Sequence, residues 1–351
     1  MSNPPWENPE VLALPRQNRM AYRLRGPVDG PAWVVLHGGP GGGGNPGLLR
    51  PFDLKRQRVI VPDQRGSGAS RPRGRPTTNS LSALVCDLEI LRKHLGLERW
   101  SVQAGSWGTV LALAYASRFP QRVERLVLRG AFALRWREVG GLLQSWRWHR
   151  GSPRAPAVWP IVPRAAGPTA LARLEQLFRT GTPGVAARRA LRHWNHLERA
   201  AAAHGMRRGL RHAASVSPPA TVAAMRASWA GMQRALRRGA ARQAHPGRLA
   251  GDRSALQKFR IQIHYLRRHA QLRPGALEQA VIALARHGVA VDWVHGRFDA
   301  VCPMANCVRW LALGQAQAPG LARGHWPLAG HLGHEPQMLA TLTRLVRRPG
   351  F

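Results

Sequence analysis

The sequence predicts an α/β fold, in which a parallel sheet with crossover helices is interrupted by a long helical insertion. Two observations predict it. Short apolar runs alternate with segments of helical periodicity near both ends of the chain. Between these regions the alternation stops, and the chain is rich in Ala, Arg and Trp at helical spacing. We therefore expect the two halves of the core at 1–133 and 276–351, and a helical cap at 134–275.

The first half of the predicted core reads as strands followed by helices. The expected strands are 31–39, 56–66, 99–106 and 122–131, and the expected helices are 84–97 and 107–119. The first two strands are short buried runs that each end in a glycine-rich turn. The helix 84–97 ends near Gly96, and Pro120 stops the helix 107–119.

The second half of the predicted core repeats this pattern. "VAVDWVHGRFD" (289–299) reads as a strand, and a helix is expected near "NCVRWLALGQAQ". A weak strand around "ARGHWPLAGH" and a closing helix "EPQMLATLTRLVRR" complete the chain. The strand and helix order therefore resumes after the insertion.

Length and composition exclude several classes of protein. A chain of 351 residues that is 44% hydrophobic can bury a large core. No apolar run suits a signal peptide or a membrane span, so we expect a cytoplasmic protein that does not contact a membrane. Cys86, Cys302 and Cys307 are too few and too scattered for a disulfide framework or a zinc site.

The net charge of +36 raises the question of nucleic-acid binding. Of the 53 basic residues only Lys55, Lys93 and Lys258 are lysine, and the arginines lie along the whole chain instead of forming a stripe. This distribution is typical of a compositional bias. We expect no specific nucleic-acid partner, and only incidental binding to polyanions at low salt.

A serine stands where the strand 99–106 meets the helix 107–119. In "AGSWG", Ala104 takes the place of the first glycine of Gly-x-Ser-x-Gly, and Gly108 keeps the second. Small neighbours allow the tight strand-to-helix turn that exposes a nucleophilic serine, and the helix directs its positive end at Ser106. A serine that only caps the helix is the structural alternative.

The partners that a nucleophilic serine needs follow later in the chain. Acyl transfer by serine requires a histidine base and a carboxylate that orients it. Asp299 lies just past the end of a strand, whereas Asp292 lies near its start. "LAGHLGHEP" offers His331 in a turn and His334 at the start of the closing helix, and we favour Asp299 and His331.

The glycine-rich stretch "HGGPGGGGNPG" follows the first predicted strand. A turn at Gly38 and Gly39 can present one backbone amide to an oxyanion, and Trp107 can present another. The stretch lacks the Gly-Lys-Ser/Thr ending of a P-loop and the spacing of a dinucleotide-binding fingerprint. An oxyanion hole is therefore a better interpretation than a phosphate-binding loop.

Several motifs together resemble the proline iminopeptidases, which are serine peptidases of the α/β-hydrolase fold. They are "HGGPGGG" (37–43), "PDQRGSGAS" (62–70), "GSWGTVLALAYA" (105–116), "LVLRGAF" (126–132), "HGRFDAVCP" (295–303) and "AGH" (329–331). The resemblance implies an α/β-hydrolase fold with a helical cap insertion. It also implies Ser106 as nucleophile, Asp299 as acid, His331 as base, and the amides of Gly39 and Trp107 as the oxyanion hole.

The cap departs from the family pattern. Family members hold the free α-amine of the substrate with cap carboxylates in a Trp-x-x-Trp-Glu segment and an Arg-Ile-Glu-x-x-Tyr-like segment. Here "WNHLE" keeps Glu198 but has Leu197 in place of the second Trp, and "FRIQIHY" has Gln262 where the glutamate is expected. The resemblance further places Phe132 against the proline ring and Cys302 near the site, although both could be core residues.

The expected function is that of a serine aminopeptidase that releases N-terminal proline from small peptides through an acyl-enzyme, without a metal or cofactor. A related esterase or amidase, in which the altered cap no longer selects a free amine, is the alternative within the same class. A binding protein on a decayed hydrolase scaffold is the alternative outside it. The sequence leaves the oligomeric state open.

Overall fold

A mixed sheet of eight strands forms the centre of the computed structural model, which describes residues 6–144 and 167–348. The strand order is β1-β2-β4-β3-β5-β6-β7-β8, and all neighbouring pairs from β4 to β8 are parallel. The strands are β1 (Glu10–Leu14), β2 (Asn18–Arg25), β3 (Ala32–Leu36), β4 (Arg58–Pro62), β5 (Trp100–Gly105), β6 (Val123–Arg129), β7 (Ala290–Val294) and β8 (Ala322–His325). The predicted α/β fold is confirmed.

The β1–β2 hairpin at one edge of the sheet was not among the predicted strands. Its strands pair with each other in antiparallel fashion, and β2 also pairs with β4 in antiparallel fashion. Arg16 and Gln17, in the turn, both have φ of 58°. Asn-Gly or Asp-Gly usually marks such a turn. Because neither dipeptide is present and the flanking strands carry several charges, the sequence gives no clear hairpin signal.

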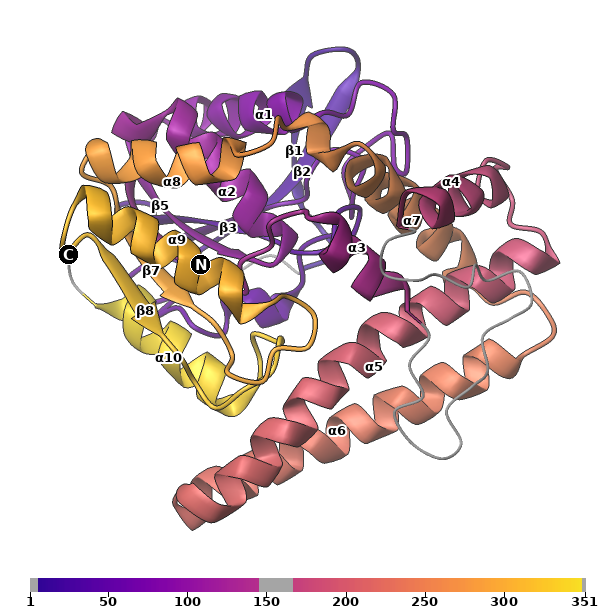
Figure 1. Cartoon of the computed structure of the whole chain (residues 1–351). Helices are drawn as coiled ribbons and strands as arrows, with labels where there is room; N and C mark the ends of the chain where they lie inside the picture. Colours follow the sequence, from indigo (N-terminus) through magenta and orange to yellow (C-terminus); the bar gives the residue numbers. More distant parts are fainter. Residues whose placement is uncertain (1–5, 145–166, 349–351) are drawn as a thin grey trace.

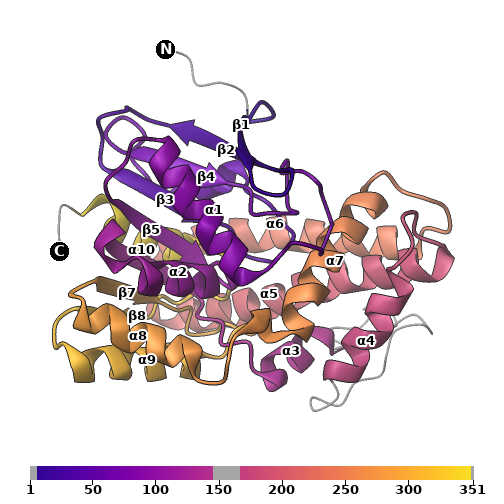
Figure 2. The ribbon, with the colours of Figure 1, turned by 90° about the horizontal axis from the view of Figure 1, so that it is seen from above.

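Successive side chains of the central strands point to opposite faces of the sheet, and apolar residues on both faces form a core on each side. Val34 and Leu36 of β3 pack into the larger cluster, whereas Trp33 and Val35 pack into the smaller cluster on the opposite face. Helices α1 (Leu81–His94), α2 (Trp107–Arg118), α8 (Ala276–Arg286) and α9 (Met304–Gln317) cover the face of the larger cluster. Helix α10 (Pro336–Arg347) covers the other face (Figures 1 and 2).

The described residues between 134 and 275 form helices and contain no strand. These helices are α3 (Trp136–Leu143), α4 (Gly167–Leu177), α5 (Val185–Val216), α6 (Pro219–Ala244) and α7 (Gly251–Arg267). Helices α5 and α6 lie side by side and project beyond the core (Figure 1). Short 3₁₀ helices occur at Pro46–Leu49, Pro120–Arg122 and His269–Gln271. Within the described ranges, no helix combines the length and apolar character needed to cross a bilayer.

Helix α7 belongs to the insertion but packs directly against loops of the core. A Cβ atom on Gly41 would lie 2.3 Å from the carbonyl oxygen of Lys258. A Cβ atom on Gly74 would lie 2.8 Å from the Cα atom of Gln257. Both glycines also have positive φ, so side chains are excluded there by backbone conformation as well as by space. The first half of α7 is therefore held close to the core.

Candidate active site

Ser106 occupies a strained turn between β5 and α2. Its φ of 55° and ψ of −125° are unusual for a residue with a side chain. Small residues make the turn possible, because a Cβ on Gly108 would lie 2.5 Å from the carbonyl oxygen of Leu36. Ala104, in place of the usual first glycine, is fully buried in the core, where its methyl group is accommodated. The backbone strain is typical of a functional serine rather than of an ordinary helix cap.

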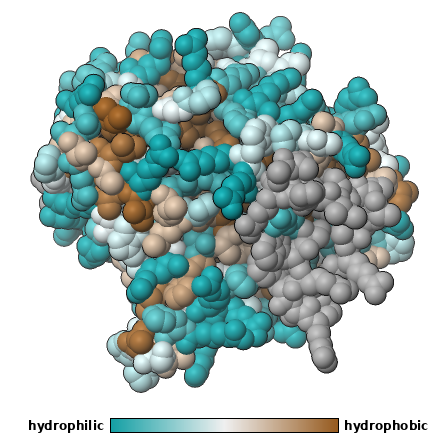
Figure 3. Space-filling view, in the orientation of Figure 1, coloured by the Kyte–Doolittle hydropathy of each residue, from teal (hydrophilic) through white to brown (hydrophobic). Residues whose placement is uncertain are grey.

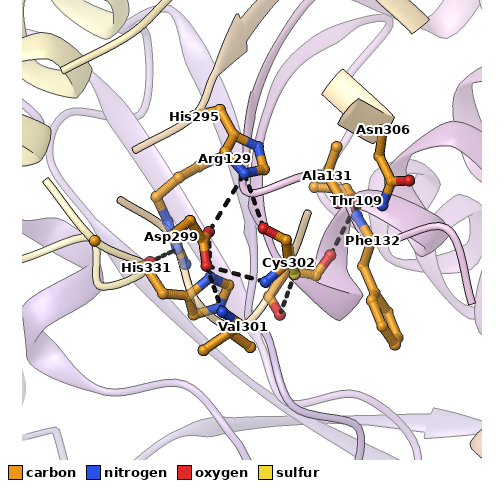
Figure 4. A network of polar contacts seen from close by, with 12 residues as sticks. Thr109, Arg129, Ala131, Phe132, His295, Asp299, Val301, Cys302, Asn306 and His331 are labelled. Atoms are coloured by element: carbon orange, nitrogen blue, oxygen red, sulfur yellow. Dashed lines mark hydrogen bonds and ion pairs between the residues drawn. The ribbon is translucent and has the colours of Figure 1, made fainter. Parts of the chain in front are cut away.

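Two loops at the carboxyl edge of the sheet bring Asp299 and His331 together. Nδ1 of His331 lies 2.7 Å from Oδ2 of Asp299 (Figure 4). The amides of Val301 and Cys302 donate hydrogen bonds of 2.8 Å and 2.9 Å to Oδ1 of the same carboxylate. These bonds fix the carboxylate, which in turn fixes the orientation of the imidazole.

The environment of Asp299 favours its ionised form. Burial acts to raise its pKa, but the neighbouring His331 charge and hydrogen bond, together with the Cys302 amide, lower the pKa to about 2. The carboxylate is therefore negatively charged at neutral pH and can stabilise an imidazolium on His331.

The alternative acid and base lie elsewhere. Asp292 is buried in the middle of β7, and its Oδ1 atom lies 2.7 Å from Nε2 of His325. His334 lies in an exposed turn just before α10, away from Asp299. Of the two candidate histidines, His331 pairs with Asp299, whereas His334 forms no ion pair with any described carboxylate.

Two buried charged residues that the sequence analysis did not single out hold the His331 loop in place. Glu335 accepts hydrogen bonds from the amides of Gly330 at 2.7 Å and Leu332 at 2.9 Å. The guanidinium of Arg129 donates a hydrogen bond to the carbonyl of His331. These hydrogen bonds fix the backbone on either side of His331. The sequence signal that could have identified Glu335 is its position in "GHEP", directly after the candidate histidines.

The glycine-rich loop after β3 lies beside Ser106. A Cβ on Gly38 would lie 3.2 Å from Cβ of Ser106, so only glycine allows this approach without movement. The amides of Gly39 and Trp107 donate no hydrogen bond to any described part of the chain. They are consequently available as donors to a substrate oxyanion.

Asp63 supports this loop and explains the "PDQRGSGAS" motif. Its carboxylate accepts hydrogen bonds from the amides of Gly44 at 2.7 Å and Ala69 at 2.8 Å, and it pairs with Arg23 at 2.9 Å. A Cβ on Gly68 would lie 2.3 Å from its carboxyl carbon. The motif thus ties two loops to one buried carboxylate.

A cavity of about 280 Å³ opens in front of these groups. Its walls include all the catalytic and substrate-binding candidates except Asp299, which lies behind His331: Gly39, Ser106, Trp107, Phe132, Glu198, Gln262, Cys302 and His331. Sγ of Cys302 is 4.0 Å from Oγ of Ser106, and burial raises the pKa of the thiol. The thiol is therefore neutral at the floor of the cavity.

The cap wall of the cavity contains an ion pair that the sequence analysis did not anticipate. Oε1 of Glu198 accepts a hydrogen bond of 2.8 Å from Nε2 of Gln262, and Oε2 lies 2.5 Å from Nζ of Lys258. Lys258 precedes Gln262 by one helical turn on α7, so the i, i+4 spacing could have identified it. The charge of Glu198 is balanced in this arrangement.

Asp299, Cys302 and His331 also form a set that could hold a metal ion, since their ligand atoms lie within 4.8 Å of one another. Metal binding needs a thiolate, and burial raises the pKa of Cys302 against that form. In addition, Asp299 and His331 already bond to each other. The set is better suited to proton transfer than to metal binding, and the absence of a metal remains a prediction.

Comparisons with known sequences identify similar proteins. Residues 31–196 match the family described as "alpha/beta hydrolase fold". A putative proline iminopeptidase from Mycoplasma pneumoniae is 31% identical over 346 residues, which cover 96% of each chain. Proline iminopeptidases from Xylella fastidiosa and Xanthomonas citri are 42% and 39% identical, over 42% and 48% of this chain. These two matches span only 46% and 52% of the relatives' own lengths.

Comparisons with solved structures agree on the fold. MGS-M2, an alpha/beta hydrolase from a Medee basin deep-sea metagenome library, aligns with a TM-score of 0.56 at 14% identity, covering 96% of this chain and 95% of that one. A thermophilic esterase from Thermogutta terrifontis aligns with a TM-score of 0.54 at 18% identity, covering 97% and 95%. At these identities, the likeness concerns the fold alone.

Proposed function

Because the chain belongs to the proline iminopeptidase family and has the α/β-hydrolase fold, we propose that it is a serine aminopeptidase that releases N-terminal proline from peptides. The observation that supports this best is the hydrogen bond between His331 and Asp299 at the cavity that contains the strained Ser106. The proposed substrates are small peptides that carry an unblocked proline at their N-terminus.

In the proposed reaction, Oγ of Ser106 attacks the prolyl carbonyl carbon. The N–H at Nδ1 of His331 donates a hydrogen bond to ionised Asp299, so that Nε2 can accept the serine proton and later deliver it to the leaving amine. The amides of Gly39 and Trp107 stabilise the oxyanion of the tetrahedral intermediate. Water then attacks the acyl-enzyme while His331 takes a proton from that water, and His331 returns this proton to Oγ of Ser106 as the acyl–oxygen bond breaks and proline leaves. No step needs a metal or cofactor.

The proposed pocket for the prolyl group is formed by Phe132 on the core side and by Glu198 and Gln262 on the cap side. Phe132 offers an apolar surface for the pyrrolidine ring, and Glu198 offers a carboxylate for its ammonium group. The pairing of Glu198 with Lys258 weakens this second contact, because an incoming ammonium must compete with a lysine that is already bound.

The same pairing favours a second candidate, an esterase or amidase for uncharged acyl groups. A panel of chromogenic substrates separates the two. We expect the highest kcat/KM for an unblocked prolyl anilide, with lower values for an alanyl anilide, an N-blocked prolyl anilide and a short acyl ester. If the blocked anilide or the ester were the best substrate, the aminopeptidase proposal would be replaced by the second candidate.

Replacing Gln262 with glutamate should strengthen the binding of the substrate amine. The Gln262→Glu variant adds a negative charge at the cap wall, where Lys258 balances only one carboxylate. We expect KM for the unblocked prolyl anilide to fall by up to about tenfold, which corresponds to about 1.4 kcal/mol. KM for the acyl ester should change much less. An unchanged ratio of anilide to ester efficiency would show that Gln262 does not face the amine.

Removing the cation beside Glu198 should act in the same direction. In Lys258→Met the carboxylate keeps its bond to Gln262 but loses its ion pair, so it is free to bind an ammonium group. We expect KM for the unblocked prolyl anilide to fall severalfold, with kcat nearly constant. Lys55→Met, at an exposed position away from the cavity, serves as the matched control. Equal effects of the two variants would count against a role for Lys258 in specificity.

A further inference from the structure

A second cavity, of about 270 Å³, lies on the other side of the Glu198–Lys258 pair from the first. Glu198 lines the first cavity, whereas Lys258 lines the second. The walls of this second cavity come from the glycine-rich loop at Gly41 and Gly42, from Arg73, and from helices α5, α6 and α7. The cavity therefore lies where the cap meets the core, outside the proposed catalytic site.

Three arginines in this cavity form no ion pair within the described ranges. In the described ranges, the side chains of Arg73, Arg199 and Arg242 form no hydrogen bond and no ion pair. Nε of Arg73 is buried and unsatisfied. A buried guanidinium donor without a partner costs free energy, since it loses its hydration and gains nothing in return. The three side chains come from a core loop, from α5 and from α6, yet they line one cavity.

The acidic groups at the cavity are already engaged. Asp252 accepts hydrogen bonds of 2.9 Å and 2.7 Å from Arg192, and Glu198 binds Lys258. Asp252 is the only carboxylate that lines this cavity among the described residues, since Glu198 lines the first cavity. After these two pairs are discounted, the three arginines leave an unbalanced charge of three positive units.

Glycines on two helices make room for the guanidinium groups. A Cβ on Gly239 of α6 would lie 3.4 Å from an Nη atom of Arg199. A Cβ on Gly251, in the first turn of α7, would lie 3.3 Å from an Nη atom of Arg242. Both guanidinium groups therefore lie against helix positions that carry no side chain.

We propose that this cavity binds a phosphate monoester or free phosphate through Arg73, Arg199 and Arg242. A carboxylate has two oxygens, and the two parallel N–H groups of one arginine can bind both. A phosphate group has more oxygens and can accept hydrogen bonds from three arginines. The cavity also exceeds the space that a few water molecules need, so an organic group attached to the phosphate fits as well. The site does not depend on the chemistry proposed for Ser106.

The site differs from the general arginine surface of the chain. Many other arginines of α5 and α6 are exposed on the projecting helices, whose visible surface is largely hydrophilic (Figure 3). Such arginines are hydrated and are screened by salt. Arg199 and Arg242 are exposed as well, but together with Arg73 they line one cavity, and this predicts a saturable site with defined stoichiometry.

Calorimetric titration of the full chain with inorganic phosphate and with glycerol 3-phosphate tests the proposal. Ionic strength is held constant with sodium chloride, so that screening of the net charge does not change. We expect one saturable site for at least one of the two ligands, and the tighter ligand identifies whether free phosphate or a monoester is preferred. The Ser106→Ala variant should bind equally well, which separates this result from the fate of the proposed peptidase activity.

Paired variants locate the site. Arg73→Gln with Arg199→Gln should weaken binding at least about tenfold, whereas Arg226→Gln with Arg234→Gln, at exposed positions of α6 outside the cavity, should leave it unchanged. Circular dichroism checks that each double variant is folded. If the Arg73→Gln, Arg199→Gln double variant does not fold, the single variant Arg199→Gln is used in its place. Equal weakening by both pairs, or no saturable binding to the parent chain, would overturn the proposal. Binding of a short single-stranded DNA through Arg73 and Arg199, without binding of either small ligand, would overturn it in favour of nucleic acid.

Discussion

Ser106→Ala should reduce kcat for the best prolyl anilide by several powers of ten, on the order of 10⁶-fold by analogy with other serine nucleophiles. The hydroxyl is the attacking group in the proposed reaction, and no other serine lines the cavity among the described residues. Alanine meets the same positive φ as serine, so the turn is no more strained in the variant than in the parent.

The measurement is a single-turnover or steady-state assay of purified variant and parent. Thermal unfolding of both proteins shows that the loss is chemical, since we expect their Tm values to agree within a few degrees. A variant that retained near-parental activity would exclude Ser106 as the nucleophile. Cys302, whose sulfur lies 4.0 Å from the serine oxygen, would then be the next nucleophile to test.

Asp299→Asn should lower kcat by roughly 10⁴-fold, the scale seen when the orienting carboxylate of a catalytic triad is replaced by an amide. An asparagine can keep the shape of the side chain, but it removes the charge that stabilises a protonated His331 and allows the wrong imidazole tautomer. The amides of Val301 and Cys302 can still donate to the asparagine oxygen, so the loop should remain in place.

The chain provides a matched control for this substitution. Asp292 is also buried and lies 2.7 Å from a histidine nitrogen, that of His325, but it does not line the proposed site. Asp292→Asn should therefore leave kcat within a few-fold of the parent. Similar losses in both variants would mean that buried Asp–His pairs affect only stability, and the assignment of Asp299 would fail.

The sequence predicted the core well because its signals are local. Each central strand is a short apolar run. Each flanking helix has apolar residues at helical spacing and a residue that ends the helix, such as Pro120. The motif around Ser106 is local too, and the structure gives the positive φ that such a turn needs. In contrast, the β1–β2 hairpin has no diagnostic turn residues, and its pairing with β4 depends on contacts far away in the chain.

The cap wall could not be predicted, because its chemistry depends on how α5 and α7 face each other. The family pattern drew attention to Glu198 and Gln262, and helical spacing places Lys258 beside Gln262, but only the packing of α5 against α7 brings Lys258 to Glu198, 60 residues away. Two further arginines, one that lines the cavity and one on α7, bind backbone carbonyls instead of Glu198. Arg129 binds the carbonyl of His331, and Arg260 binds backbone carbonyls beginning at Phe178.

The close contact of α7 with Gly41 and Gly74 has a consequence for how the cap moves. The backbone of α7 contacts the backbone of two core loops, so the helix cannot move outward without breaking those contacts. We therefore expect α7 to stay in place on the core. Helix α5 is held in the same way at Gly205, where a Cβ would lie 2.4 Å from the carbonyl oxygen of Phe298, so substrate entry and proline release depend on movement of the outer ends of α5 and α6. In hydrogen exchange we expect the amides in the middle of α7 to be protected about as long as those of the central strands, while the outer ends of α5 and α6 exchange much sooner. The length and sequence of that outer pair are accordingly free to diverge in evolution, whereas the two glycines are not.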